Sequence, residues 1–173
     1  MINIMSYITK QILTTSLNIK PNEIHKDIDT LIQRKLIGNV EGLCYEDGYI
    51  INGSVRILKR NMGKIVTYDN QSATRYIITY EASVISPSDG EIIDVYVSNI
   101  NKMGVISYIK LDSDKTMTSQ TSPMIIIIPQ NYFEESVLNI EDINVGQTLK
   151  VQILGSRIKF RSDKIQCVAK PVS

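Results

Sequence analysis

The sequence has few of the residue types on which several protein classes depend. Its 173 residues include no tryptophan, two phenylalanines, two cysteines and one histidine, His25. Two cysteines do not make a disulfide framework, so we expect Cys44 and Cys167 to be buried thiols of an intracellular protein. We expect His25 to be a surface residue, and a histidine-based metal site or catalytic triad would be incomplete with it alone.

Long apolar runs and catalytic motifs are also missing. The longest apolar run, Met124–Ile128, suits a buried strand and is far shorter than the ~20 residues of a membrane helix. We find no secretory signal, phosphate-binding Walker loop, nucleophile elbow or paired-cysteine motif. Asp112 and Asp114 are spaced like metal ligands, but their loop lacks the glycine and final glutamate of an EF-hand. The sequence therefore predicts a non-catalytic protein without metal, cofactor or membrane contact.

An excess of charge is absent as well. Nineteen basic and 18 acidic residues give a net charge of +1, which excludes a strongly basic nucleic-acid binder. Residues 1–80 carry 10 basic and 7 acidic residues, whereas residues 81–173 carry 9 and 11. Any contact with nucleic acid should therefore be local and weak.

Two strand patterns flank a break near the middle of the chain. Apolar residues alternate over 76–84 and again over 93–97, as in strands buried on one face. Ser86–Gly90 between them is rich in turn-forming residues, and Pro87 cannot donate to a strand ladder. We therefore predict two small domains, residues 1–86 and 87–173.

The first half has the pattern of an α+β domain. We expect a strand over Ile2–Leu13, a short connector over Leu17–Lys20, and a helix that begins at Pro21 and ends at Gly38. The apolar stripe of that helix is Ile24, Ile28, Leu31, Ile32 and Leu36. Asp47-Gly48 predicts a hairpin, and further strands up to Ile85 complete an antiparallel sheet on which the helix packs.

The second half predicts an all-β barrel. We expect five short strands with alternating apolar residues, interrupted by a polar loop at 111–122 and an irregular link at 129–142. This pattern matches an OB barrel. Val105, Ser107 and Ile109 should share one strand face and Ile106, Tyr108 and Lys110 the other.

Two groups of residues are candidate sites. The first is a basic and apolar loop, for which we expect either a protein partner or apolar side chains folded back on the sheet: Lys59, Arg60, Met62, Gly63, Lys64 and Ile65. The second is an outer barrel face on which aromatics and cations could hold single-stranded RNA, although a solvated surface explains the same residues: Tyr96, Lys102, Ile106, Tyr108, Lys110, Lys159, Arg161 and Lys164.

A series of short segments resembles the seventh subunit of RNA polymerase II and its counterpart in the archaeal RNA polymerase. Order and spacing hold over nearly the whole chain, through Val40–Cys44, Gly48–Ile51, Tyr80–Val84, Pro87, Gly90–Asp94, Asn101–Gly104 and Leu149–Arg157. The resemblance implies an RNP-like first domain, whose tip loop aligns with Asn61–Val66, and an S1-type OB second domain. The family usually has an aromatic residue where this chain has Ile106, and Tyr108 on the same face supplies one. The loop 111–122 is an insertion relative to the family.

The resemblance also implies partners and a role. A family member is a polymerase stalk subunit that docks on the polymerase core, on the largest and sixth-type subunits at the base of the clamp. It contacts emerging RNA and usually pairs with a fourth-type subunit. The divergent, isoleucine-rich sequence suggests a large DNA virus with its own polymerase, which would place the protein in cytoplasm and virion; a cellular eukaryotic protein would be nuclear. The alternative function is a free-standing S1-type RNA-binding protein in translation or RNA decay.

Overall fold

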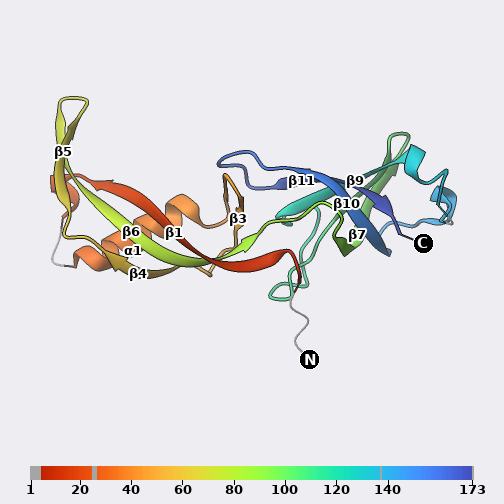
Figure 1. Cartoon of the computed structure of the whole chain (residues 1–173), viewed down its shortest axis with the longest axis horizontal. Coiled ribbons are helices and arrows are strands. Elements are labelled where there is room, and N and C mark those ends of the chain that lie inside the picture. Colours follow the sequence, from red (N-terminus) through yellow and green to blue (C-terminus); the bar gives the residue numbers. More distant parts are fainter. Residues whose placement is uncertain (1–4, 25–26, 137, 173) are drawn as a thin grey trace. The chain divides into compact units, whose positions relative to one another are not determined.

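A computed structural model describes residues 5–24, 27–136 and 138–172 (Figure 1). The chain forms two compact units. The sheet unit comprises Ile8–Leu43 and Ile50–Ile85. The barrel unit comprises Cys44–Tyr49, Ser86 onward and the described residues up to Tyr7. His25, for which we expected a surface position, lies outside the described residues.

Strand β6 is the centre of the sheet unit. It spans Gln71–Ile85 and pairs antiparallel with β1 (Ile8–Ile19), β4 (Arg56–Arg60) and β5 (Lys64–Tyr68). The strand predicted over Ile2–Leu13 is confirmed from Ile8 to Leu13, Met5–Tyr7 precede β1, and residues 2–4 lie outside the described residues. The expected connector after Leu17 is wrong because Leu17 and Ile19 are buried and continue the ladder with β6.

The α-helix of the sheet unit begins later than the sequence suggested. Pro21–Glu23 is a single 3₁₀ turn, η1, and α1 spans Ile28–Val40. The Asp27 side chain caps α1 by accepting a hydrogen bond from the backbone N–H of Thr30 at 3.2 Å, so an N-cap aspartate rather than a proline starts the helix. Gly38 lies within the helix instead of ending it.

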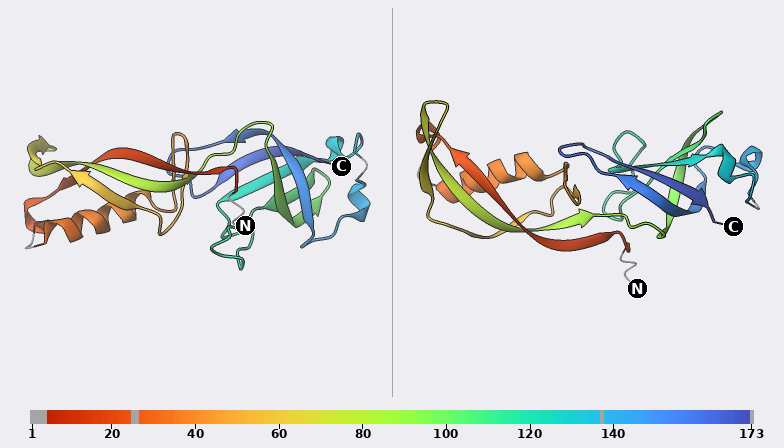
Figure 2. Two further views of the ribbon diagram at one scale, coloured as in Figure 1. Left: turned by 60° about the horizontal axis from the view of Figure 1, so that its bottom comes forward. Right: turned by 45° about the horizontal axis from the view of Figure 1, so that its top comes forward.

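The buried face of α1 agrees with the predicted stripe. Leu31, Ile32 and Leu36 are buried, whereas Ile24 precedes the helix and is exposed. The helix lies along one face of the sheet formed by β1 and β6 (Figure 2). The opposite face of that sheet therefore carries the more polar alternate residues of β1.

A short hairpin near the middle of the chain confirms the Asp-Gly signal. Strands β2 (Cys44–Tyr45) and β3 (Gly48–Ile50) pair antiparallel, with Tyr45 opposite Gly48. Glu46 and Asp47 therefore form the turn, and Gly48 is the first residue of β3.

Five strands close the barrel. They are β7 (Ile92–Asn101), β8 (Gly104–Tyr108), β9 (Met124–Pro129), β10 (Thr148–Arg157) and β11 (Ile165–Pro171). Around the barrel the order is β10-β11-β9-β8-β7, and β9 pairs with β11 in parallel. This closed arrangement is compatible with an OB-like domain, as the alternation in the second half predicted.

The barrel interior follows the predicted alternation. Val105, Ser107 and Ile109 are fully buried, which confirms their shared inner face on and just after β8. The Ser107 hydroxyl donates to the backbone carbonyl of Ile126 at 2.9 Å, so the one polar side chain among them is satisfied. The link after β9 contains two 3₁₀ turns, η2 (Gln130–Tyr132) and η3 (Ile140–Asp142).

Candidate functional site

The loop between β4 and β5 presents two apolar side chains to solvent. Met62 is 94% exposed and Ile65 is 77% exposed, so neither folds back on the sheet. Lys59 and Lys64 beside them are also exposed. We call residues 59–65 the docking loop. Exposed apolar side chains that gather on one surface can mark a protein-binding site.

Asn61 and Gly63 give the docking loop a defined shape. The Asn61 side-chain oxygen accepts hydrogen bonds from the backbone N–H groups of Gly63, at 3.2 Å, and Ile77, at 3.0 Å. Gly63 has a φ of +87°, and a Cβ atom there would lie 2.7 Å from the Tyr76 ring. A glycine is therefore required by both the backbone conformation and the close approach to β6.

Arg60 belongs to the support of the docking loop. Its guanidinium forms an ion pair with Asp29 of α1 and lies 5.4 Å from the centre of the Tyr76 ring. The hydrogen bond to Asp29 raises the pKa of Arg60. The structure thus separates Arg60, which is held within the sheet unit, from the exposed Lys59 and Lys64.

The outer face of the barrel brings together three of the predicted RNA-binding residues. Tyr96 on β7 lies opposite Tyr108 on β8, with ring centroids 6.0 Å apart. The Lys110 ammonium lies 4.4 Å from the centre of the Tyr96 ring. Ile106 lies on the same face of β8, opposite Asn99 of β7. We call Tyr96, Ile106, Tyr108 and Lys110 the tyrosine face.

The remaining predicted residues lie in two turns. Lys102 lies in the turn between β7 and β8, at the far end of that hairpin from Tyr96. Lys159 and Arg161 lie in the turn between β10 and β11, which β9 separates from β8 in the barrel order. Arg161 N–H donates to the Cys44 carbonyl at 2.8 Å, and this contact fixes the turn within the barrel unit.

Lys164 differs from its neighbours because its charge is already engaged. Its ammonium donates to the backbone carbonyls of Ser119, Gln120 and Ser122 at 3.2, 2.8 and 2.8 Å. We expected Lys164 to belong to a basic surface. In the structure its ammonium anchors the segment before β9.

Sequence reasoning missed an exposed aromatic side chain. Phe160 is 67% exposed and stands between Lys159 and Arg161. An aromatic residue between two cations in a turn is a signal for base stacking that the strand patterns did not include.

The side chains that could bind a metal ion are scattered in the described part of the chain. No group of three or more histidine, cysteine, aspartate or glutamate side chains there could hold a metal ion. Burial raises the pKa of Cys44 to about 11 and that of Cys167 to about 12, so neither is a thiolate nucleophile near neutral pH. Among the same residues, no helix is long and apolar enough to cross a membrane.

The fold and these surfaces define a class of protein: a helix-on-sheet unit with an exposed docking loop, joined to an OB-like barrel with an aromatic and basic face. No family model matches the chain. The chain is similar to the "DNA-directed RNA polymerase II subunit rpb7" of Schizosaccharomyces pombe, with 26% identity over 155 residues and 84% of each chain covered. This similarity over most of both chains supports the resemblance to the seventh-subunit family that the series of short segments indicated. The fungal relative gives no support to a viral source.

The close approach at Gly63 leads to a prediction about stability. Gly63→Ala places a methyl group against Tyr76 as well as straining the backbone, so we expect it to lower the free energy of unfolding by about 1–3 kcal/mol. Gly53→Ala is the matched control, since Gly53 has a φ of +79° and nothing within 4 Å of the added atom. Urea unfolding measures both variants. Equal losses would show that the contact with Tyr76 does not restrain the loop.

Proposed function

We propose that this protein is a non-catalytic stalk subunit of a multisubunit DNA-directed RNA polymerase, which docks through its sheet unit and contacts emerging RNA with its barrel. The observation that carries the proposal is the docking loop. Met62 and Ile65 are exposed on a loop that Asn61, Gly63 and Arg60 hold in one shape. The similar fungal protein is by name a polymerase subunit, and the similarity extends over most of both chains.

Docking would remove the two apolar side chains from water. Burial of one such side chain stabilises a complex by roughly 1.5–3 kcal/mol before the costs of association. Lys59 and Lys64 would meet acidic groups at the rim of the receiving pocket, where charges mainly accelerate and orient association. The receiving surface would be formed by the largest and sixth-type subunits at the base of the clamp. On this proposal the sheet unit is an RNP-like tip domain.

RNA contact is supported by where the cations and aromatics lie on the barrel. OB barrels bind single strands over their second and third strands and over the turns that follow the first and fourth strands. Here the second strand carries Ile106 and Tyr108, the first turn carries Lys102, and the last turn carries Lys159 and Arg161. Tyr108 would stack on a base while the lysines meet phosphates without reading sequence.

The proposal also implies where in the cell the protein lies and which other subunit binds it. The protein would lie wherever its polymerase lies: in the nucleus of a cellular eukaryote, or in cytoplasm and virion if a virus encodes it. A fourth-type subunit would be its companion in the stalk. Weak affinity for RNA suffices in such a complex because the transcript emerges at high local concentration.

The docking loop can be tested with a double variant. Met62→Asp with Ile65→Asp would bring two charges into an apolar pocket, so we expect polymerase association to fall at least tenfold while the isolated chain stays folded. Co-purification with the polymerase measures the effect. Val145→Asp, at an exposed apolar residue of the barrel unit, is the control and should associate normally. Unchanged co-purification of the double variant would remove this role from the loop.

The tyrosine face can be tested by crosslinking. Loss of a stacking aromatic costs about 1–3 kcal/mol per base, so Tyr108→Ala with Lys110→Ala should strongly lower the crosslinking of nascent transcript to this subunit in the assembled polymerase. Lys150→Ala, on the exposed side of β10, should leave the yield intact. If the double variant crosslinks as well as the wild type, the barrel contacts RNA elsewhere or serves only as a spacer.

A further inference from the structure

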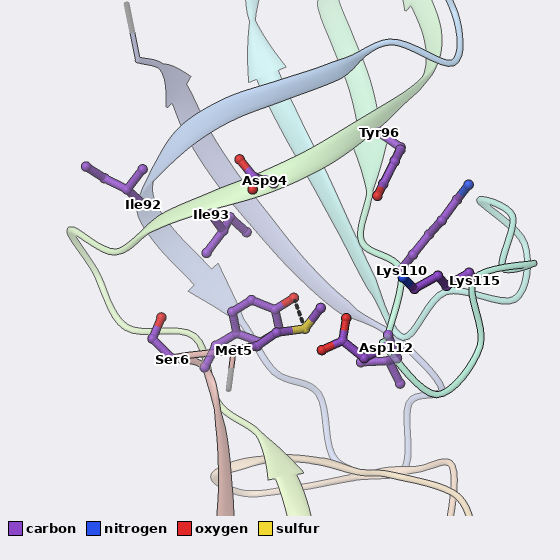
Figure 3. A pocket seen from close by; sticks show the side chains of 11 residues that line it. Met5, Ser6, Ile92, Ile93, Asp94, Tyr96, Lys110, Asp112 and Lys115 are labelled. Atoms are coloured by element: carbon purple, nitrogen blue, oxygen red, sulfur yellow. Dashed lines mark hydrogen bonds between the residues drawn. The ribbon is translucent and has the colours of Figure 1, made fainter. Parts of the chain in front are cut away.

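A cavity of about 540 Å³ opens beside the tyrosine face, entirely within the barrel unit. Tyr96, Lys110, Asp112 and Lys115 lie toward one side of the cavity, and Ile92 and Ser6 toward the other, with Asp94 of β7 between them (Figure 3). Met5, Ser6 and Tyr7 form its floor together with three apolar residues, Ile92, Ile93 and Leu111. This volume lies within the range of small-ligand sites.

The floor of the cavity is held in place by polar contacts. The Ser6 hydroxyl donates to a Glu91 carboxylate oxygen at 2.9 Å, and the Ser86 N–H donates to the Tyr7 carbonyl at 2.8 Å. The Tyr7 side chain is only 5% exposed, and its hydroxyl donates to the Met5 sulfur at 2.9 Å. Burial, followed by the carboxylates of Asp112, Asp94 and Glu91, raises the pKa of Tyr7, so this hydroxyl keeps its proton.

The side that carries Lys110, Asp112 and Lys115 is equally well anchored. Beyond the cavity, Lys164 ties the same connecting segment through the three carbonyls described above, and the buried Ser122 hydroxyl donates to the Ile109 carbonyl at 2.7 Å. Leu111 pairs with Asp114 in an isolated bridge. The polar loop 111–122 therefore supplies a shaped wall that carries Asp112 and Lys115, next to Lys110.

The charges of the cavity restrict its ligand. Two lysines oppose a free cation, and two aspartates oppose a free phosphate or carboxylate. A purely apolar ligand would leave all four groups without partners as it displaced their water. A flat, neutral molecule with hydrogen-bond donors next to acceptors fits the combination. Because Tyr96 and Lys110 belong to both the cavity and the tyrosine face, this ligand would be part of the same RNA strand.

We propose that the cavity receives a single guanine base of single-stranded RNA; this inference rests on the RNA contact proposed above. Guanine presents the N1–H and N2–H₂ donors beside the O6 acceptor on one edge, with the N7 acceptor beyond. Asp112 accepts from the two donors, Lys115 donates to O6, and the base lies beside the pair that the Lys110 ammonium forms with the Tyr96 ring. Asp94 accepts from the ribose 2′-hydroxyl.

The same pairing pattern would reject adenine. Adenine has an acceptor at N1 where guanine has a donor, so the Asp112 carboxylate would face a lone pair, and Lys115 would face the adenine amino group instead of O6. A site that is built to pair with particular donors discriminates strongly against a base that lacks them. Recognition of one base in this way adds specificity to a barrel whose other contacts are with phosphates and ring faces.

The test uses the full chain and fluorescently labelled uridine oligomers that carry one central guanosine, inosine or adenosine. Fluorescence anisotropy should give the guanosine oligomer roughly tenfold tighter binding than the adenosine oligomer, with inosine, which lacks the N2 amino group, between them. Asp112→Asn should reduce the preference to about twofold or less, because an amide offers one acceptor where the carboxylate offers two. Asp142→Asn, at an exposed carboxylate outside the cavity, should keep the full preference.

Each other outcome has a distinct meaning. Equal binding of the guanosine and adenosine oligomers by the wild type would overturn the guanine site and leave the non-specific RNA contact standing. A guanosine preference that survives Asp112→Asn and a parallel Asp94→Asn variant would also overturn it, since the preference would arise elsewhere. Failure to bind any oligomer would overturn the guanine site, whereas the weaker contact with nascent RNA is tested separately by crosslinking in the assembled polymerase. Docking on the polymerase is also measured separately and would be unaffected.

Discussion

The hydrogen-bonded ladders of β6 support the shape of the sheet unit and of its docking loop. One edge of this strand pairs with β1 along twelve residues, and the other pairs with β4 and then with β5. The point where the second edge passes from β4 to β5 is where the docking loop leaves the sheet. Thr74, Tyr76 and Ile77 of β6 lie beneath that loop and contact Gly63 or Asn61. Strand β6 forms hydrogen bonds with Asn61 and lies close to Gly63. These contacts hold the backbone of the loop while its two apolar side chains remain exposed.

In the barrel unit, closure of the five strands determines which side chains face outward. The parallel pairing of β9 with β11 and the antiparallel pairing of β7 with β10 leave none of the five strands with a free long edge. The apolar residues that close the core point inward, and every second residue points out. Tyr96 and Tyr108 therefore meet on the outside as a direct consequence of the register that buries Val95 and Ser107. The same register places Asp94 on the outside, at the mouth of the cavity.

Much of this arrangement could be predicted from periodicity alone. The alternation in β6, β7 and β8 identified both sheets and the correct faces, because a period of two leaves little freedom once one face is buried. The helix start could not be predicted from Pro21, since a proline suits a 3₁₀ turn as well, and the capping aspartate competes for the role. The end of β1 was placed too early because Leu17 and Ile19 resemble a connector until their burial against the sheet is known.

The functional surfaces were predicted less completely, for a physical reason. Their candidate residues were visible in the sequence, but exposure depends on contacts between distant segments. In the sequence, Arg60 cannot be distinguished from the neighbouring lysines, because its ion pair with Asp29 of α1 joins two distant segments. The cavity is lined by both Tyr7 and Asp112, which are more than 100 residues apart in the sequence, and no local pattern connects two such residues.

The proposed function makes this chain a stable subunit of an RNA polymerase. Its most direct test is purification of the tagged wild-type chain from its source cells under native conditions, followed by mass spectrometry of what accompanies it. Polymerase core subunits should be recovered in amounts comparable to the chain, including after nuclease treatment that removes RNA. Recovery of the chain alone, or with ribosomal or RNA-decay proteins that nuclease releases, would contradict the claim and favour a free-standing RNA-binding protein.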